Sequence, residues 1–177
     1  MYKTKSLYTK IALSAIEEYL DRKSTQNTEK QDIPNELLII RSCFVTLKTL
    51  DGKLRGCIGT IKPKYKNLFT EIIRNAVSSA FNDMRFSKLK LKELEQITIS
   101  VEVLTPPEEI FDINELNPKR YGAIIQDKTY SRGILLPNIE GIDTIEEQIR
   151  IIKRKAGIDQ NVNKDLRYFR FETQKYF

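Results

Sequence analysis

The chain repeats one order of predicted elements, and this repeat restricts the fold more than any other feature of its 177 residues. Each copy contains a strand, a hairpin turn, a strand, a helix and a strand, because β-rich runs alternate with apolar residues at helical spacing. The first copy spans about residues 37–111, with strands at 37–50, 54–61 and 97–103, a turn at 51–53, a helix at 68–81 and a short helical turn around 91–94. The second copy spans about residues 121–177, with strands at 121–126, 132–137 and 166–171, a turn at 127–128 and a helix at 145–156.

Helix-capping residues and a recurring dipeptide support the prediction of both copies. Asn67 is a predicted N-cap of the first long helix, and Thr144 with Glu147 forms a predicted capping box before the second. An Arg-Gly pair also recurs, at Arg55-Gly56 and at Arg132-Gly133. These repeats predict an α+β fold in which two related halves form antiparallel sheets with packed helices, with a cleft between the halves.

An additional amphipathic helix is predicted within residues 1–20, followed by a polar loop at 21–35. We therefore expect one domain over residues 1–177. No apolar run approaches the roughly 20 residues that cross a bilayer, and the N-terminal stretch lacks the continuous apolar region of a signal peptide. A cytoplasmic location is the corresponding expectation.

Histidine is absent from the chain, which excludes Ser-His-Asp and Cys-His catalysis and histidine-ligated metals. The two cysteines, Cys43 and Cys57, are too few for a disulfide framework, and without histidine they are too few for a zinc site. No acidic cluster has the spacing of a metal site. We expect no metal and no cofactor, and a binding protein is favoured over an enzyme.

The segment LRGCIGT, residues 54–60, is the most distinctive motif. Gly56 and Gly59 within a predicted strand indicate a bulge or a close approach to the backbone. Arg55 and Cys57 would point to the same face of a regular strand, and a guanidinium beside a thiol makes that thiol more nucleophilic. Cys57 is therefore a candidate catalytic residue, although unpaired buried cysteines more often behave as small apolar side chains.

Arg55, Asp83 and Arg85 form a second candidate group. An Arg-Asp ion pair would tie the motif strand to the loop after the helix. Alternatively, Arg55 and the glycine backbone would face a phosphate or a carboxylate, although the glycine spacing matches no phosphate-binding loop.

Residues 48–66 carry six basic residues against Asp51 alone. Such a stretch fits either a nucleic-acid-binding surface or a solvated lysine-rich face. The excess of lysine over arginine favours the solvated face.

Several motifs together resemble the AMMECR domain, from about residue 37 to the C-terminus, and the opening helix fits as well. They are LRGCIGT, SSAFNDMRF, ITISVEVLTPPEEI, YGAII, GILLPNI, RKAGI and YFRFE, in this order. Within the family's Asp-Pro-Arg-Phe-Pro-Pro stretch this chain has Met84, Ser87 and Lys88 in place of the prolines. Tyr121 replaces a frequent histidine, and Lys153 replaces a frequent cysteine.

The resemblance implies a duplicated α/β arrangement and a place in an AmmeMemoRadiSam system, with a Memo-like protein and a radical SAM protein as partners. It implies no established reaction. The expected role is a non-catalytic partner or adaptor module whose motif residues shape a cleft or an interface. The residues expected there are Arg55, Gly56, Cys57, Gly59, Asp83, Arg85 and Arg132. An enzyme that uses Cys57 and Arg55, and a nucleic-acid-binding module that uses residues 48–66, are the alternatives.

Overall fold

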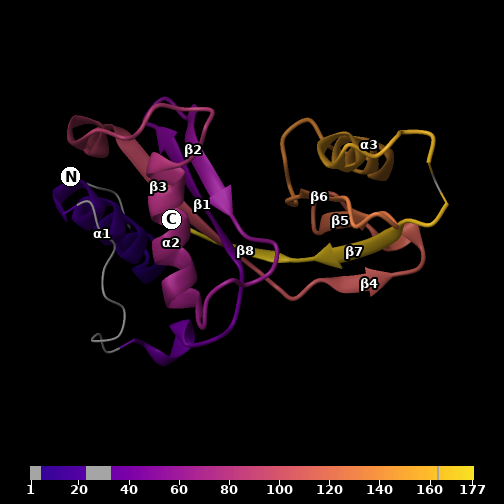
Figure 1. Ribbon diagram of the computed structural model, residues 1–177, viewed down its shortest axis with the longest axis horizontal. Coiled ribbons are helices and arrows are strands. Elements are labelled where there is room, and N and C mark those ends of the chain that lie inside the picture. The colour runs from indigo at the N-terminus through magenta and orange to yellow at the C-terminus, as the bar shows by residue number, and fades with distance from the viewer. Residues whose placement is uncertain (1–4, 23–32, 163) are drawn as a thin grey trace. The chain divides into compact units, whose positions relative to one another are not determined.

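The computed structural model describes residues 5–22, 33–162 and 164–177, and most of the predicted loop at 21–35 lies outside these residues. The chain divides into two compact units. Unit 1 contains residues 1–103 and 174–177, and unit 2 contains residues 104–173. Figure 1 labels the elements of both.

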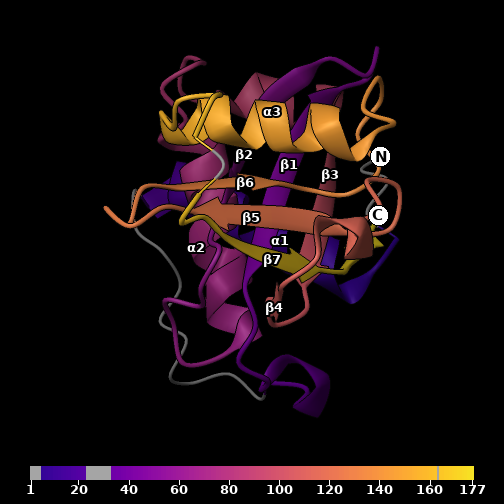
Figure 2. The same ribbon diagram turned by 90° about the vertical axis from the view of Figure 1, so that its right-hand side faces the viewer.

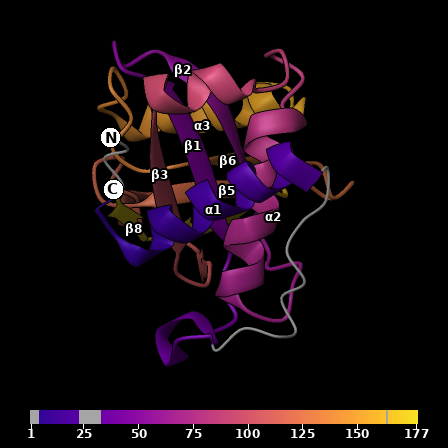
Figure 3. The same ribbon diagram turned by 90° about the vertical axis from the view of Figure 1, so that its left-hand side faces the viewer.

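Unit 1 contains a four-stranded sheet with the strand order β2-β1-β3-β8. The strands are β1 (Cys43–Thr49), β2 (Leu54–Gly59), β3 (Ile97–Leu104) and β8 (Thr173–Tyr176). The helices are α1 (Leu7–Arg22) and α2 (Leu68–Phe81), with short 3₁₀ turns η2 (Asn35–Leu37) and η3 (Leu91–Gln96). Figure 3 shows α1 and α2 across one face of the sheet. Their apolar stripes and the alternate residues of β1 and β3 form one buried core.

Unit 2 is a second four-stranded sheet, in the order β4-β7-β5-β6. It contains β4 (Glu108–Ile110), β5 (Gly122–Gln126), β6 (Arg132–Leu135), β7 (Arg167–Phe171), α3 (Ile145–Ala156) and the turn η4 (Ile113–Glu115). In Figure 2 the strands run side by side, with α3 beside β6. A separate apolar core includes Ile125, Leu135 and Ile152.

The predicted duplication is confirmed, because β1-β2-α2-β3 and β5-β6-α3-β7 give equivalent strand orders, β2-β1-β3 in unit 1 and β6-β5-β7 in unit 2.

The Arg-Gly repeat has a structural basis. A Cβ atom on Gly56 would lie 2.2 Å from the carbonyl oxygen of Ser79, and one on Gly133 would lie 2.4 Å from that of Ile152. In each half, therefore, the returning strand passes so close to its helix that only glycine fits.

The fourth strand of each sheet lies outside its own copy of the repeat, because it follows the last strand of the other copy in the chain. β4 follows β3 in the chain but pairs with β7, and β8 follows β7 but lies beside β3. The chain accordingly passes between the units twice, after Val103 and before Gln174. Neither short strand was predicted, because β4 has only three residues and β8 reads TQKY, which carries no apolar alternation.

Helix limits agree best with the prediction. Helix α2 spans the predicted residues, and the Asn67 side chain accepts a hydrogen bond from the Thr70 N–H. Thr144 caps α3 as predicted, but the Glu147 carboxylate accepts from the N–H of Asp143, one residue before the cap. The predicted strand at 37–50 is wrong in its first six residues.

Residues 37–42 contain only the last residue of the turn η2, a bend, and an irregular stretch that leads into β1. The carbonyl of Ile39 accepts a hydrogen bond from the Leu68 N–H at the start of α2 instead of joining the sheet. Its aliphatic composition resembles that of a buried strand, whereas Leu38, Ile39 and Ile40 are 45–63% exposed.

Candidate functional site

A β-bulge lies within the LRGCIGT motif. In the register of β1 with β2, Gly56 is opposite Leu47 and Leu54 is opposite Lys48, so Arg55 is the extra residue. A bulge breaks the two-residue alternation of side chains. The expectation that Arg55 and Cys57 share a face rested on a regular strand and fails at this point.

The bulge coincides with a charge pair between β2 and η3. Arg55 Nε donates to Glu93 Oε1 at 2.8 Å, and Arg55 Nη2 donates to Glu93 Oε2 at 3.2 Å. The Arg55 side chain is only 10% exposed, and this contact lowers the pKa of Glu93. Arg55 therefore takes no part in the ion pair of Asp83, since its guanidinium pairs with a residue 38 positions later in the chain.

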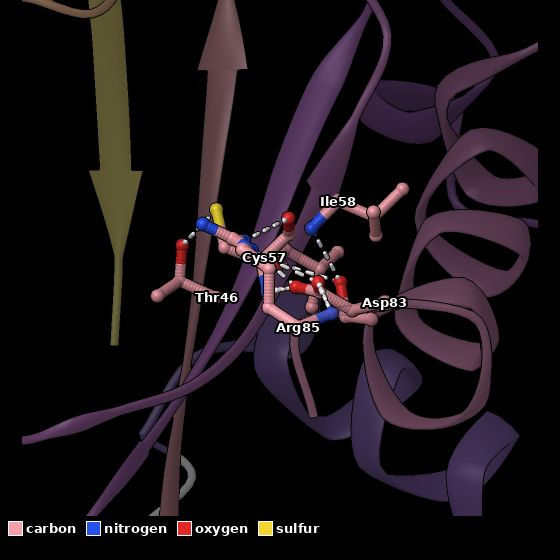
Figure 4. A network of polar contacts seen from close by, with 7 residues as sticks. Thr46, Cys57, Ile58, Asp83 and Arg85 are labelled. Atoms are coloured by element: carbon pink, nitrogen blue, oxygen red, sulfur yellow. Dashed lines mark hydrogen bonds and ion pairs between the residues drawn. The ribbon is translucent and has the colours of Figure 1, made fainter. Parts of the chain in front are cut away.

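Asp83 instead holds the edge of the sheet. Its Oδ2 accepts from the Cys57 N–H at 2.9 Å and from Arg85 Nη2 at 2.7 Å, while Arg85 Nη2 also donates to the Cys57 carbonyl at 3.2 Å. Both backbone groups of Cys57 are thus satisfied by the loop after α2 (Figure 4). β2 is an edge strand, and an edge strand with open backbone groups can pair with other chains.

The hydrogen bonds from the Arg85 guanidinium and from the backbone N–H groups of Cys57 and Arg85, together with the charge of Arg85, hold the pKa of Asp83 far below its usual range. Asp83 remains ionised at any physiological pH, so it cannot serve as a proton acceptor near neutrality.

Cys57 is half-buried, and its Sγ lies 3.2 Å from Thr46 Oγ1 (Figure 4). Arg85 contributes a nearby positive charge. No group of three or more metal-ligating side chains gathers in the described part of the chain. Cys43 is fully buried, and burial raises the pKa of its thiol to about 12. Of the two thiols, only Cys57 is placed to react with a reagent from solution.

A buried polar stripe along α2 positions this edge, and we did not identify it in the sequence. Its members recur every four residues and are all less than 9% exposed: Asn67, Glu71, Asn75, Ser79 and Asp83. Four-residue spacing places side chains on one face of a helix, so the signal was available.

The stripe bonds mainly to the backbone of β1 and β2 and of the loop after β2. Ser79 Oγ accepts from the Ile58 N–H at 2.8 Å and donates to the Val45 carbonyl at 2.7 Å, and so takes the place of a hydrogen bond between two facing residues of the strands. Glu71 is fully buried, where it accepts from two loop N–H groups and from the Thr60 hydroxyl. Asn75 donates to the Cys43 carbonyl.

The basic stretch at 48–66 does not form one continuous surface. Lys53 pairs with Asp51 in the hairpin turn, and Arg55 is buried against Glu93. Lys62, Lys64 and Lys66 lie beyond the opposite end of β2. A six-residue strand of about 20 Å separates the two groups.

The remaining predicted site residues are Gly59 of β2 and Arg132 of β6. Gly59 packs against the Phe44 ring, and a Cβ there would lie 2.3 Å from the ring. Arg132 lies in unit 2, with its guanidinium 5.7 Å from the centre of the Phe169 ring. Unit 1 itself therefore brings together Cys57, Asp83 and Arg85.

Comparison with known proteins gives consistent results. A family model described as AMMECR1 matches residues 9–176. An uncharacterised protein of Thermotoga maritima is 45% identical over 170 residues, with 96% of each chain covered. The solved structure of the uncharacterised protein PH0010 from Pyrococcus horikoshii covers 98% of this chain and 93% of its own, with a TM-score of 0.86 and 32% identity.

A Clostridium acetobutylicum protein is 40% identical over 178 aligned positions. The match covers 97% of this chain but only 36% of that protein. A segment like this one is therefore part of a longer polypeptide there. In the described ranges, no helix has both the length and the hydropathy to cross a membrane.

Proposed function

This chain belongs to the AMMECR1 family, and on that premise we propose that it is a non-catalytic partner module that binds the Memo-like or radical SAM protein of an AmmeMemoRadiSam system. The observation that carries the proposal is an exposed apolar and basic surface at one end of unit 1. We call it the Leu38 surface, and it consists of Leu38, Ile39, Ile40, Tyr65, Lys62, Lys64 and Lys66.

The Leu38 surface is held in place by the backbone. The Ile39 carbonyl accepts from the Leu68 N–H at 2.8 Å, and Ser42 Oγ donates to the Ile61 carbonyl at 3.3 Å, so the two segments run side by side. Three consecutive exposed aliphatic residues are unusual on a soluble protein and are typical of binding surfaces. The three lysines make no ion pair with any described residue, so an acidic partner surface would complement them.

The contacts made by the charged residues around the LRGCIGT motif support a binding role over a catalytic one. Asp83 and Arg85 bind the Cys57 backbone, and Arg55 binds Glu93. These charged groups stabilise the edge strand, and no general base with a pKa near neutrality lies beside Cys57 among the described residues. The longer Clostridium relative adds support, because the domain is there joined to further sequence in one chain.

The test is association with the Memo-like protein of the same genome, measured by calorimetry under reducing, low-salt conditions. Ile40→Asp places a charge in the centre of the aliphatic run and should weaken binding at least tenfold. Leu91→Asp is the matched control, since Leu91 is 71% exposed but lies in η3, outside the Leu38 surface. The proposal fails if neither the Memo-like nor the radical SAM protein binds, or if Leu91→Asp weakens binding as much as Ile40→Asp does.

One observation favours a second candidate, an enzyme or enzyme subunit that uses Cys57. The thiol is half-buried, and the positively charged Arg85 guanidinium lies near it. Cys57→Ala distinguishes the two functions, because it would abolish a Cys57-dependent reaction but should leave partner binding within about twofold of wild type.

A further inference from the structure

A row of three polar side chains crosses the sheet of unit 2. Gln126 of β5 is paired with Arg132 of β6 on one side and with Arg167 of β7 on the other. Paired residues of neighbouring strands lie on the same face of a sheet, so the two guanidiniums flank the Gln126 amide. The next paired row on this face contains Phe169, whose ring centre lies 5.7 Å from Arg132 Cζ and 5.1 Å from Arg167 Cζ. These strands lie side by side in Figure 2.

The two arginines differ in their partners. Arg167 Nε and Nη2 donate to the two oxygens of Glu109, both at 2.7 Å. Arg132 makes no side-chain hydrogen bond and no ion pair with any residue in the described ranges, and its Nε is shielded from solvent. Burial and the nearby charge of Arg167 lower the pKa of Arg132. A partly buried positive charge therefore lies beside a second one without a counter-charge of its own.

The equivalent position in unit 1 carries an arginine that has a carboxylate partner. Arg55 occupies the equivalent place before Gly56, and Glu93 neutralises it with two hydrogen bonds. Arg132 precedes Gly133 in the same way but has no carboxylate partner among the described residues. A desolvated charge without a partner costs free energy, and a bound anion would remove that cost.

We propose that Arg132, Gln126 and Arg167 form a binding site for the phosphate group of a small phosphorylated molecule. Three donor side chains from three adjacent strands match the three acceptor oxygens of a phosphate monoester, whereas a carboxylate offers two. The free fork of Arg132 provides bidentate contact, and the Gln126 amide donates between the two guanidiniums. Glu109 is the opposing charge at this site, because it competes with the ligand for Arg167.

The probe is inorganic phosphate, titrated into the full chain at constant ionic strength and followed by calorimetry, with succinate as the carboxylate comparison. We expect saturable phosphate binding that is tighter than succinate binding. Arg132→Gln should weaken phosphate binding at least tenfold, and Glu109→Gln should strengthen it several-fold by releasing Arg167. Arg120→Gln is the control, because Arg120 is an exposed arginine of unit 2 that pairs with Glu172. It should bind phosphate like wild type.

A second readout separates binding from a structural role. Without phosphate, Arg132→Gln should unfold at the same temperature as wild type or higher, since it removes an uncompensated charge. If that variant does not fold, Arg132→Lys carries the test, because it keeps the charge but loses the fork and should bind phosphate more weakly. The proposal is overturned if wild type shows no saturable binding, if succinate binds more tightly than phosphate, or if Arg132→Gln and Arg120→Gln have equal effects.

Discussion

Removal of the Asp83 carboxylate should release the edge of the unit 1 sheet. The Asp83 side chain is 4% exposed, and it accepts from the Cys57 N–H and from Arg85. A hydrogen bond to a charged group contributes about 1.5–3 kcal/mol, and an orphaned buried N–H costs about 1–3 kcal/mol. The Arg85 side chain is 58% exposed, so water can replace much of what its ion pair with Asp83 contributes to stability.

Two substitutions separate these contributions. Asp83→Ala removes both acceptors and should lower the free energy of unfolding by about 3 kcal/mol. Asp83→Asn keeps an acceptor for the Cys57 N–H and should cost about 1–2 kcal/mol. Glu172→Gln, in an exposed pair with Arg120, should cost less than about 1 kcal/mol. Urea denaturation followed by circular dichroism measures all three.

The pH dependence provides a stricter test. The folded-state pKa of Asp83 lies below its unfolded value of about 3.9. The stability that Asp83 contributes is therefore complete above about pH 4 and is lost as the pH falls below that value toward the folded-state pKa. The stability difference between wild type and Asp83→Asn should shrink between pH 4 and pH 2. A constant difference over this range, or a cost below about 1 kcal/mol for Asp83→Ala, would refute the reasoning.

Three further outcomes follow from unit 1. Ser79→Ala leaves an N–H of one strand and a carbonyl of its neighbour unpaired, so chemical denaturation should show a loss of about 1–3 kcal/mol. Gly56→Ala should prevent folding as judged by circular dichroism, since its Cβ would overlap a helix carbonyl, whereas Gly52→Ala, with open space around it and a φ of +85°, should cost only about 1–2 kcal/mol. Iodoacetamide at pH 8 should modify Cys57 in the native protein but reach Cys43 only after denaturation, and mass spectrometry of the two peptides would contradict this if both reacted alike.

The features predicted correctly are those determined by residues that lie close together in the sequence. The limits of α2 follow from apolar pairs every four residues and from the Asn67 cap, all within one helix length. The repeated strand order follows from alternation and turn residues. The polar stripe that includes Glu71 and Ser79 was equally local but was overlooked because the apolar periodicity of α2 already explained the helix.

The features predicted wrongly depend on distant contacts. The bulge at Arg55 and the partner Glu93 are separated by 38 positions, and nothing near either residue specifies the other. Aliphatic residues at 37–40 have the composition of a buried strand, and only the hydrogen bond from the Leu68 N–H to the Ile39 carbonyl shows that they lie against the start of α2 instead of joining the sheet. Pairing choices of this kind are decided by tertiary packing rather than by propensity.

The reciprocal exchange of β4 and β8 has a consequence for synthesis of the chain on the ribosome. The outer neighbour of β3 is β8, which is translated only after residues 105–172, the greater part of the other unit. Until then the nascent chain carries an unpaired edge at β3, a template for association with other nascent chains. The stacking of Tyr176 on Tyr8, with ring centres 3.7 Å apart, then joins the last strand to the first helix. Assembly of the N-terminal unit should therefore be among the last events of folding, and chaperones would be needed earliest at this edge.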